Sequence, residues 1–369
     1  AQTSTSPLLL EFTSAKGVWM YNSENRGYID LISGIGVSNI GHCHPKVVKA
    51  VQEQAETFMH LMVYGEYVQS PQVKLASLLA QQLPETLNCS YFVNSGTEAT
   101  EGAMKLAKRK TGRREIISCK NSYHGSTQGA LSLMSSEYFK TGYEPLLSDI
   151  RHIEFNELSD LELITEKTAA VFIEPIQGEA GIRIANKEYL EALRHRCNQT
   201  GTLLVFDEIQ TGYGRTGYLF AFQKYNVIPD ILLLAKGIGG GMPIGAFISS
   251  TEIMSVLSNN PVLGHLTTFG GHPVNCAAAL ATLKTLLAEG MIKDVESKGQ
   301  LFEDLLVHPA ILEIRRAGLM MALQFDSYEN NKKVIDGCIE DGLITDWFLH
   351  CDDALRIAPP LVINEEEIK

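Results

Sequence analysis

A lysine and an aspartate each end a strongly apolar stretch of this sequence. Lys236 follows residues 232–235, and Asp207 follows residues 203–206. A buried ammonium group is unfavourable unless its pKa falls or the amine is used covalently, as in a Schiff base. A buried carboxylate needs a cationic partner, and a protonated pyridine nitrogen would be one. The simpler alternatives are a lysine that reaches the surface and an acid that caps a helix or binds magnesium.

A second motif combines small hydroxyl residues with the start of a helical pattern. Ser95, Gly96 and Thr97 follow an apolar run and precede that pattern. Gly96 permits close approach of the backbone, and a helix N-terminus offers free N–H groups, so the motif predicts a phosphate site. An ordinary capping box closed by Glu98 explains the same residues.

Two further motifs also follow apolar runs. Tyr123 and His124 precede a glycine, so the Tyr123 ring could stack on a flat cofactor, although both residues could equally fill the core. Residues 174–179 leave an apolar run, and Pro175 interrupts the strand so that the later polar side chains enter a loop. A solvated turn is the alternative for that segment.

The glycines of residues 212–217 match the dinucleotide fingerprint G-x-G-x-x-G. That fingerprint joins a strand directly to a helix, and an acid ends the next strand about 20 residues later. Here Asp207 already ends the strand, and Asp230 precedes the next one. The pattern therefore disfavours a nicotinamide site.

The motifs lie at strand ends or in the loops that follow, where open parallel sheets bind ligands. Strand-like runs alternate with helical patterns, which predicts an α/β fold whose mostly parallel sheet has helices on both faces. The expected strands are 91–94, 115–118, 169–174, 202–207, 231–235 and 244–249. Helical spacing is clearest at 47–58 and at 71–83, where Ser70 is the expected cap and Pro71 lies in the first turn.

Both ends of the chain are expected to build a small α+β domain. We assign residues 1–45 to its N-terminal segment, 46–288 to a large ligand-binding domain and 289–369 to its C-terminal part. Residues 311–316 are predicted to be helical.

Composition excludes several classes of function. The chain has 369 residues, 45% hydrophobic and 20% charged, as expected of a globular protein. Its net charge of -12 disfavours binding to nucleic acid or an anionic membrane. Seven cysteines without a C-x-x-C pair favour a reducing cytoplasm, and we expect neither a signal peptide in residues 1–12 nor a membrane span. His42, His44 and His272 form no compact ligand set, so we expect no metal site.

Taken in order, these motifs and the Thr267-Thr268 run resemble the class III pyridoxal-phosphate-dependent aminotransferases, nearest to the acetylornithine and ornithine subgroup. The resemblance extends from about Gly34 to Pro360. It implies fold type I of the PLP transferases, pyridoxal 5'-phosphate as cofactor, and a homodimer with shared active sites. It also implies transfer of an amino group from an amino acid or omega-amine to 2-oxoglutarate.

Two alternatives remain. The same fold and cofactor could serve an aminomutase, a racemase or a decarboxylase. A binding protein without catalysis is disfavoured, because it would not need Lys236, Asp207 and Arg356 together.

The resemblance assigns a role to each matching residue. Lys236 would hold the cofactor as a Schiff base and shuttle the proton, and Asp207 would pair with the pyridine nitrogen. The remaining cofactor-binding residues would be Ser95, Gly96 and Thr97 around the phosphate, Tyr123 and Ile209 on the two ring faces, His124 beside them, Gln210 at the ring hydroxyl, and Thr268 at the phosphate of the neighbouring subunit.

Three residues would bind the substrates. Arg356 matches the arginine that binds the carboxylate next to the reacting centre, and Glu179 the glutamate that neutralises this arginine while an omega-amino donor is bound. Ser126 stands where acetylornithine, ornithine and 4-aminobutyrate enzymes typically carry an arginine for the donor's distal carboxylate. Losing that charge should cost several kcal/mol, which disfavours acetylornithine in the usual pose. A diamine, lysine-like or other omega-amino donor is expected instead.

Overall fold

A seven-stranded sheet forms the centre of the protein in the computed structural model, which describes residues 3, 7–63 and 65–369. Its strand order is β4-β12-β11-β10-β7-β5-β6, and only β12 runs antiparallel to its neighbours. The strands are β4 Cys89–Val93, β5 Glu115–Cys119, β6 Ile150–Ile153, β7 Thr168–Ile173, β10 Leu203–Asp207, β11 Ile231–Leu234 and β12 Gly245–Ser249. The predicted α/β fold with a mostly parallel sheet is confirmed.

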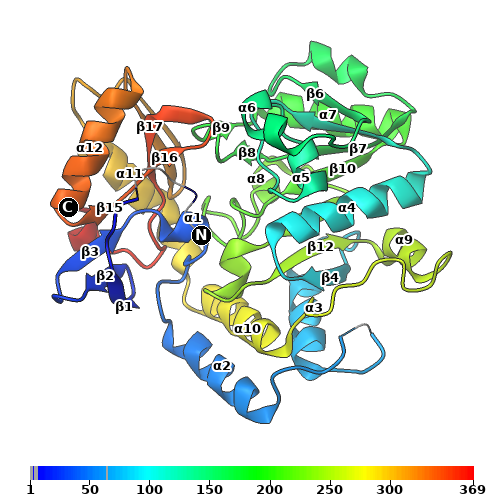
Figure 1. Ribbon diagram of the computed structural model, residues 1–369, viewed down its shortest axis with the longest axis horizontal. Helices are drawn as coiled ribbons and strands as arrows, with labels where there is room; N and C mark the ends of the chain where they lie inside the picture. The colour runs from blue at the N-terminus through cyan, green and yellow to red at the C-terminus, as the bar shows by residue number, and fades with distance from the viewer. Residues whose placement is uncertain (1–2, 4–6, 64) are drawn as a thin grey trace.

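The inner strands of this sheet are buried on both faces. Every residue of β7 and β11 is buried, which is why these strands appear in the sequence as continuous apolar runs. Helices α4 Gly96–Thr111 and α7 Lys187–Thr200 pack against the sheet, and α10 Pro273–Ala288 packs against α2 Pro45–Thr57 and α3 Ser70–Gln82 (Figure 1).

The predicted cap of α3 is wrong. The helix begins at Ser70, its N-cap is Gln69, and no side chain bonds to the first turn. Pro71 does lie in that first turn, where its missing N–H has no partner to lose.

Both ends of the chain meet in one small sheet. Strand β15 Leu343–Ile344 pairs in parallel with β3 Gly27–Asp30, which continues into β2 Trp19–Asn22 and β1 Phe12–Lys16. Figure 1 shows these blue strands beside the orange and red C-terminal elements. On this topology we propose the division into residues 1–45, 46–288 and 289–369.

A second four-stranded sheet corrects the prediction for residues 311–316. They were expected to be helical, but β13 Glu313–Ala317 is a strand that pairs antiparallel with β14 Met320–Gln324. The two join through Gly318, whose φ of 60° suits glycine. Strands β17 Cys351–Ile357 and β16 Trp347–Phe348 complete this sheet, and α12 Tyr328–Glu340 packs against it. Pairing within the β13–β14 hairpin therefore overrides the helical pattern of these residues.

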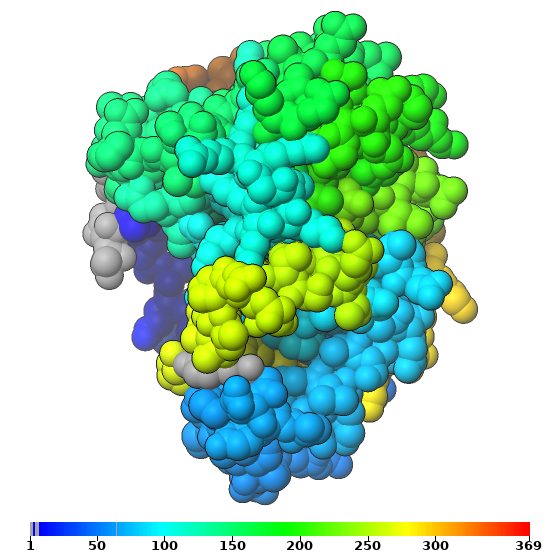
Figure 2. Space-filling view, turned by 90° about the vertical axis from the view of Figure 1, so that its right-hand side faces the viewer, coloured from blue at the N-terminus to red at the C-terminus, as the bar shows by residue number. Residues whose placement is uncertain are grey.

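The remaining elements are short. They are α1 Ser33–Gly36, α5 Gln128–Ser132, α6 Glu137–Lys140, α8 Phe222–Tyr225, α9 Thr251–Met254, α11 Val295–Leu305, α13 Glu365–Ile368, the strands β8 Ile176–Gln177 and β9 Arg183–Ile184, and 3-10 turns at Thr141–Tyr143, Ser159–Leu163, Lys236–Gly239, Ser255–Ser258 and Met291–Asp294. Figure 2 shows the yellow segment that follows α9 beside the blue segment that leads from α2 to α3, and the rings of Phe269 and His60 in these two segments are in contact. Within the described residues, no helix is long and apolar enough to span a membrane.

Candidate active site

A cavity of about 680 Å³ opens where several central strands end. It has the size of a small-molecule site. All of the predicted site residues except Thr268 and Arg356 line it: Ser95, Gly96, Thr97, Tyr123, His124, Ser126, Glu179, Asp207, Ile209, Gln210 and Lys236. Residues from loops more than 100 positions apart are thus brought to one place.

Asp207 is held rigidly at the floor of this cavity. Its Oδ2 lies 2.7 Å from Nδ1 of His124, and its Oδ1 accepts a hydrogen bond of 3.0 Å from the backbone N–H of Ile209. Asp207 and His124 are both buried. Burial lowers the pKa of His124, but the hydrogen bond and charge of Asp207 and the charge of Glu174 raise it above its ordinary value. The imidazole of His124 therefore holds the Asp207 carboxylate in place beside the cavity.

Glu174 is a site residue to which the sequence assigned no role. Its Oε1 accepts from the N–H of Tyr123 at 3.0 Å, and its Oε2 accepts from the N–H of Gly178 at 2.9 Å. Burial raises its pKa to about 7, and the charge of Asp207 adds to this effect. Glu174 thus joins the loop of Tyr123 to the loop of Glu179. Its only signal in the sequence was its position directly after a buried strand.

Lys236 begins a 3-10 turn directly after β11. Its φ of 51° is left-handed, which costs roughly 1 kcal/mol for a residue with a Cβ. Burial lowers the pKa of its amine, and so does the charge of Arg356, while Glu179 acts in the opposite direction. Across the described part of the chain, no carboxylate oxygen lies within 4.0 Å of its Nζ. A half-buried amine without an ion pair can act as a nucleophile.

Ser95 caps helix α4, and the N-terminus of this helix faces the cavity. The Ser95 Oγ accepts from the N–H of Glu98 at 3.3 Å, which is one half of the predicted capping box. Glu98 returns its carboxylate to the N–H of Asn94, at 2.7 Å, rather than to that of Ser95. A Cβ on Gly96 would lie 2.9 Å from Cδ1 of Ile209, so a larger residue here would displace that side chain. The helix N-terminus leaves room for an anion here.

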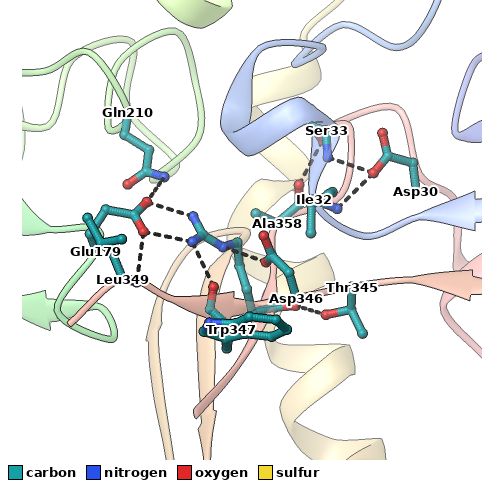
Figure 3. A network of polar contacts seen from close by, with 11 residues as sticks. Asp30, Ile32, Ser33, Glu179, Gln210, Thr345, Asp346, Trp347, Leu349 and Ala358 are labelled. Atoms are coloured by element: carbon teal, nitrogen blue, oxygen red, sulfur yellow. Dashed lines mark hydrogen bonds and ion pairs between the residues drawn. The ribbon is translucent and has the colours of Figure 1, made fainter. Parts of the chain in front are cut away.

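Arg356 and Glu179 form a bidentate ion pair at the edge of the cavity (Figure 3). Nη1 and Nη2 of Arg356 each donate to one oxygen of Glu179 at 2.9 Å. Burial alone would raise the pKa of Glu179, but the charge and hydrogen bonds of Arg356 lower it to about 2. Arg356 comes from β17 and Glu179 from the loop after β8, so the pair joins two sheets.

Asp346 is a second partner of Arg356 that the sequence did not reveal. Its Oδ1 accepts from Nε of Arg356 at 2.9 Å, so that two carboxylates hold one guanidinium group (Figure 3). Gln210 contacts the same carboxylate, since its Nε2 lies 3.5 Å from Oε1 of Glu179. One edge of Arg356 is thus fixed by Asp346, while the other faces the cavity through Glu179.

Two predicted residues lie apart from these networks. Thr268 is exposed and does not line the cavity of its own protomer. Ser126 lines the cavity, and its Oγ is 3.1 Å from the hydroxyl of Tyr123.

The glycine-rich motif at 212–217 has a structural role in this fold. Its Arg215 is buried and donates to the carbonyl of Leu319 at 2.9 Å and to Oδ1 of Asn39 at 2.7 Å. The motif therefore connects three segments of the chain, as expected if it is no nucleotide fingerprint.

Comparisons with known proteins agree on one family. The chain matches the Aminotransferase class-III family over residues 1–369. It is 42% identical to an acetylornithine aminotransferase of Methanocaldococcus jannaschii, covering 96% of this chain and 89% of that protein. A second, from Methanopyrus kandleri, is 40% identical, with 96% and 90% covered.

Solved structures show the same fold. The ornithine aminotransferase of Toxoplasma gondii, described with partial occupancy of PLP at its active site, superposes with a TM-score of 0.92 at 31% identity, over 99% of this chain and 88% of that one. An (S)-enantioselective omega-transaminase from Thermomicrobium roseum gives a TM-score of 0.91 at 30% identity, over 99% and 93%.

Proposed function

Because this chain belongs to the class-III aminotransferases, enzymes of fold type I that use pyridoxal 5'-phosphate, we propose that it transfers an amino group from an omega-amine or amino acid to 2-oxoglutarate. The observation that carries this proposal is the convergence of Lys236, Asp207 and the Arg356–Glu179 pair at one cavity. The bound cofactor supplies an electron sink for the carbanion at the donor carbon.

The residues of the cavity fit this cofactor. The volume of about 680 Å³ accommodates a substituted pyridine ring, and Gly96 leaves space that a Cβ would fill. We assign the phosphate to Ser95, Gly96 and Thr97 at the helix N-terminus. Tyr123 and Ile209 would enclose the two ring faces, and Gln210 would contact the ring hydroxyl.

Lys236 and Asp207 would carry the chemistry. The lowered pKa of Lys236 leaves its amine neutral more readily, so it can bind the cofactor and then accept and return the proton at the donor carbon. Asp207, oriented by His124, would keep the ring nitrogen protonated. His124 acts through Asp207 and is a positioning residue.

The Arg356–Glu179 pair would let two kinds of substrate use one site. With Glu179 in place, Arg356 is neutralised and an amine lacking an adjacent carboxylate can bind. A carboxylate of 2-oxoglutarate would replace Glu179 on the Nη1 and Nη2 edge, while Asp346 keeps hold of Nε.

The donor should differ from that of the curated relatives. Ser126 offers no charge to a distal carboxylate, and the absence of such a partner costs several kcal/mol. We therefore propose a diamine, lysine-like or other omega-amino donor instead of acetylornithine in its usual pose. A specificity constant for acetylornithine comparable to that for the best diamine would contradict this.

We also propose a homodimer, in which Thr268 reaches the phosphate of the neighbouring subunit. Thr268 precedes Phe269, which is 55% exposed, and the segment between α2 and α3 carries Met59 and Val68 at 65% and 92% exposure. The rings of His60 and Phe269 lie 5.1 Å apart, so both segments belong to one patch. Such patches mark interfaces.

All seven cysteines are free, which supports our proposal of a reducing cytoplasm.

A half-reaction tests the transfer. Purified holoenzyme is mixed with single donors, including L-glutamate, while the absorption spectrum of the cofactor is recorded. We expect conversion to the amino form of the cofactor, and its reversal by 2-oxoglutarate with formation of glutamate. Loss of carbon dioxide or isomerisation of the donor, without transfer to 2-oxoglutarate, would favour a decarboxylase, mutase or racemase.

A further inference from the structure

A second cavity, of about 730 Å³, adjoins the first and shares Tyr123, Ser126, Glu179 and Lys236 with it. We propose that this second cavity binds the tail of the amino donor and selects a tail that is uncharged and largely apolar. The inference rests on the proposed transfer function and narrows its donor: among the omega-amino donors proposed above, it favours those with an uncharged tail over diamines and lysine-like donors.

The wall of the second cavity is mainly apolar. It is formed by Ile35, Leu131, Met134, Phe139, Tyr143 and Leu349, with Gln128 and Thr3 as neutral polar neighbours. Leu131 and Met134 are themselves buried, so this part of the wall is firmly packed. The Phe139 ring packs edge-on against His350, with centroids 5.5 Å apart. An alkyl or aryl tail would therefore remove apolar surface from water on several sides.

The described residues that line this space offer no unpaired charge to a donor tail. Among the described residues that line it, the charged ones are Lys236 and Glu179. Lys236 is committed to the cofactor, and both oxygens of Glu179 are bound by Arg356. Lys140, on the same short helix as Phe139, is paired with Glu137 at 2.9 Å. A carboxylate tail would find no cation there and an ammonium tail no anion, and an unpaired charge is costly to bury.

Ser126 lies at the junction of the two cavities and sets their charge. Its hydroxyl is bonded to that of Tyr123 and contributes no formal charge. An arginine at this position would place a guanidinium group beside the tail. The identity of this one residue should therefore decide whether the tail can be anionic.

The test compares three donors of similar length in the half-reaction of the holoenzyme. Hexylamine has a neutral tail, cadaverine a distal ammonium and 5-aminovalerate a distal carboxylate, and L-glutamate serves as the reference. We expect kcat/KM for hexylamine to exceed that of each charged donor by at least about 10-fold. Equal or higher values for cadaverine or 5-aminovalerate would overturn the inference.

Two variants locate the effect. Ser126→Arg should raise the ratio of 5-aminovalerate to hexylamine by at least about 10-fold, whereas Ser297→Arg, on the exposed side of α11, should leave that ratio unchanged. Phe139→Ala should lower kcat/KM for hexylamine by about 10-fold more than it lowers kcat/KM for L-glutamate. An unchanged ratio in Ser126→Arg, with L-glutamate still reacting, would refute the assigned role of Ser126.

L-glutamate separates the two levels of proposal. If the wild-type enzyme converts L-glutamate but not hexylamine, the tail site is wrong and the transfer function stands. If L-glutamate itself fails to convert the cofactor, the proposed function is wrong and the tail site falls with it.

Discussion

Glu174 and Glu179 lie five residues apart on either side of the short strand β8, yet they occupy opposite environments. Glu174 is buried and accepts from two backbone N–H groups, and burial raises its pKa to about 7. Glu179 is buried against Arg356, and its pKa is lowered to about 2. The cofactor side of the cavity is thus held by fixed backbone donors, whereas the substrate side is held by a side-chain ion pair.

This difference has a functional meaning. Backbone donors cannot move without unfolding the loop, so Glu174 fixes the position of Tyr123. The guanidinium group of Arg356 can exchange one carboxylate for another at little cost, because an incoming carboxylate restores both hydrogen bonds. The cofactor side should therefore be rigid and the substrate side exchangeable.

The largest expected loss of activity concerns Lys236, which lies between the cofactor side and the substrate side of the cavity. Lys236→Ala removes the nucleophile and the group that moves the proton, so kcat/KM should fall by at least about 10⁴-fold, which corresponds to more than about 5 kcal/mol. The half-reaction with L-glutamate measures this. Lys333→Ala, an exposed lysine on α12, is the control and should keep its rate. A loss of less than about 10-fold in Lys236→Ala would contradict the role of Lys236 as nucleophile and proton carrier.

The next effect concerns the ion pair. Arg356→Ala would leave Glu179 and Asp346 buried without their shared cation, so the free energy of unfolding should fall by about 3–5 kcal/mol. Denaturant unfolding of the apoenzyme measures this loss. In Glu174→Gln only one of two backbone N–H groups loses its acceptor, which should cost about 1–3 kcal/mol. A larger loss of unfolding free energy in Glu174→Gln than in Arg356→Ala would contradict this prediction. It would show that the ion pair on the substrate side stabilises the fold less than the backbone hydrogen bonds of Glu174 do.

The two carboxylates also predict opposite responses to pH. Both have an ordinary pKa of 4.5. Glu179, whose folded pKa is lower, stabilises the fold above pH 4.5, and this stabilisation is lost as the pH falls towards 2. Glu174, whose folded pKa is higher, favours the folded state below pH 4.5, and that contribution is lost as the pH rises through 7. Each residue should change the free energy of unfolding by about 3 kcal/mol between its unfolded and its folded pKa.

Unfolding free energies measured across this pH range separate the two residues. Glu174→Gln should flatten the dependence between pH 4.5 and 7, and Glu179→Gln the dependence below pH 4.5. Unchanged pH profiles in both variants would show that the two environments do not differ in solution.

Much of the large sheet could be predicted, because buried parallel strands leave continuous apolar runs. The expected strands coincide with β4, β5, β7, β10, β11 and β12, and their ends differ by no more than two residues. Strand β6 was missed, since the sequence Ile-Arg-His-Ile of this edge strand contains no continuous apolar run. Residues 313–317 were assigned to the wrong class because only their pairing with β14 makes them a strand.

The site divides in the same way. Lys236 and Asp207 were recognisable because each is an ionisable residue at the end of its own apolar run. Glu174 and Asp346 were not, because their significance comes from contacts with distant segments. Glu174 lies beside the loop of Tyr123, and Asp346 holds Arg356 against Glu179.

The smallest effect separates a helix cap from a phosphate ligand. Ser95 and Ser327 each cap a helix by accepting from a backbone N–H at 3.3 Å, but only Ser95 lines the cavity. Alanine at either position should lower the free energy of unfolding of the apoenzyme by about 1 kcal/mol. If Ser95 also binds the phosphate, Ser95→Ala alone should weaken cofactor binding, by at least about 10-fold for one hydrogen bond to a charged group. Equal cofactor affinity in both variants, measured by titrating the apoenzymes with cofactor, would assign Ser95 to the helix alone and leave the phosphate to Gly96 and Thr97.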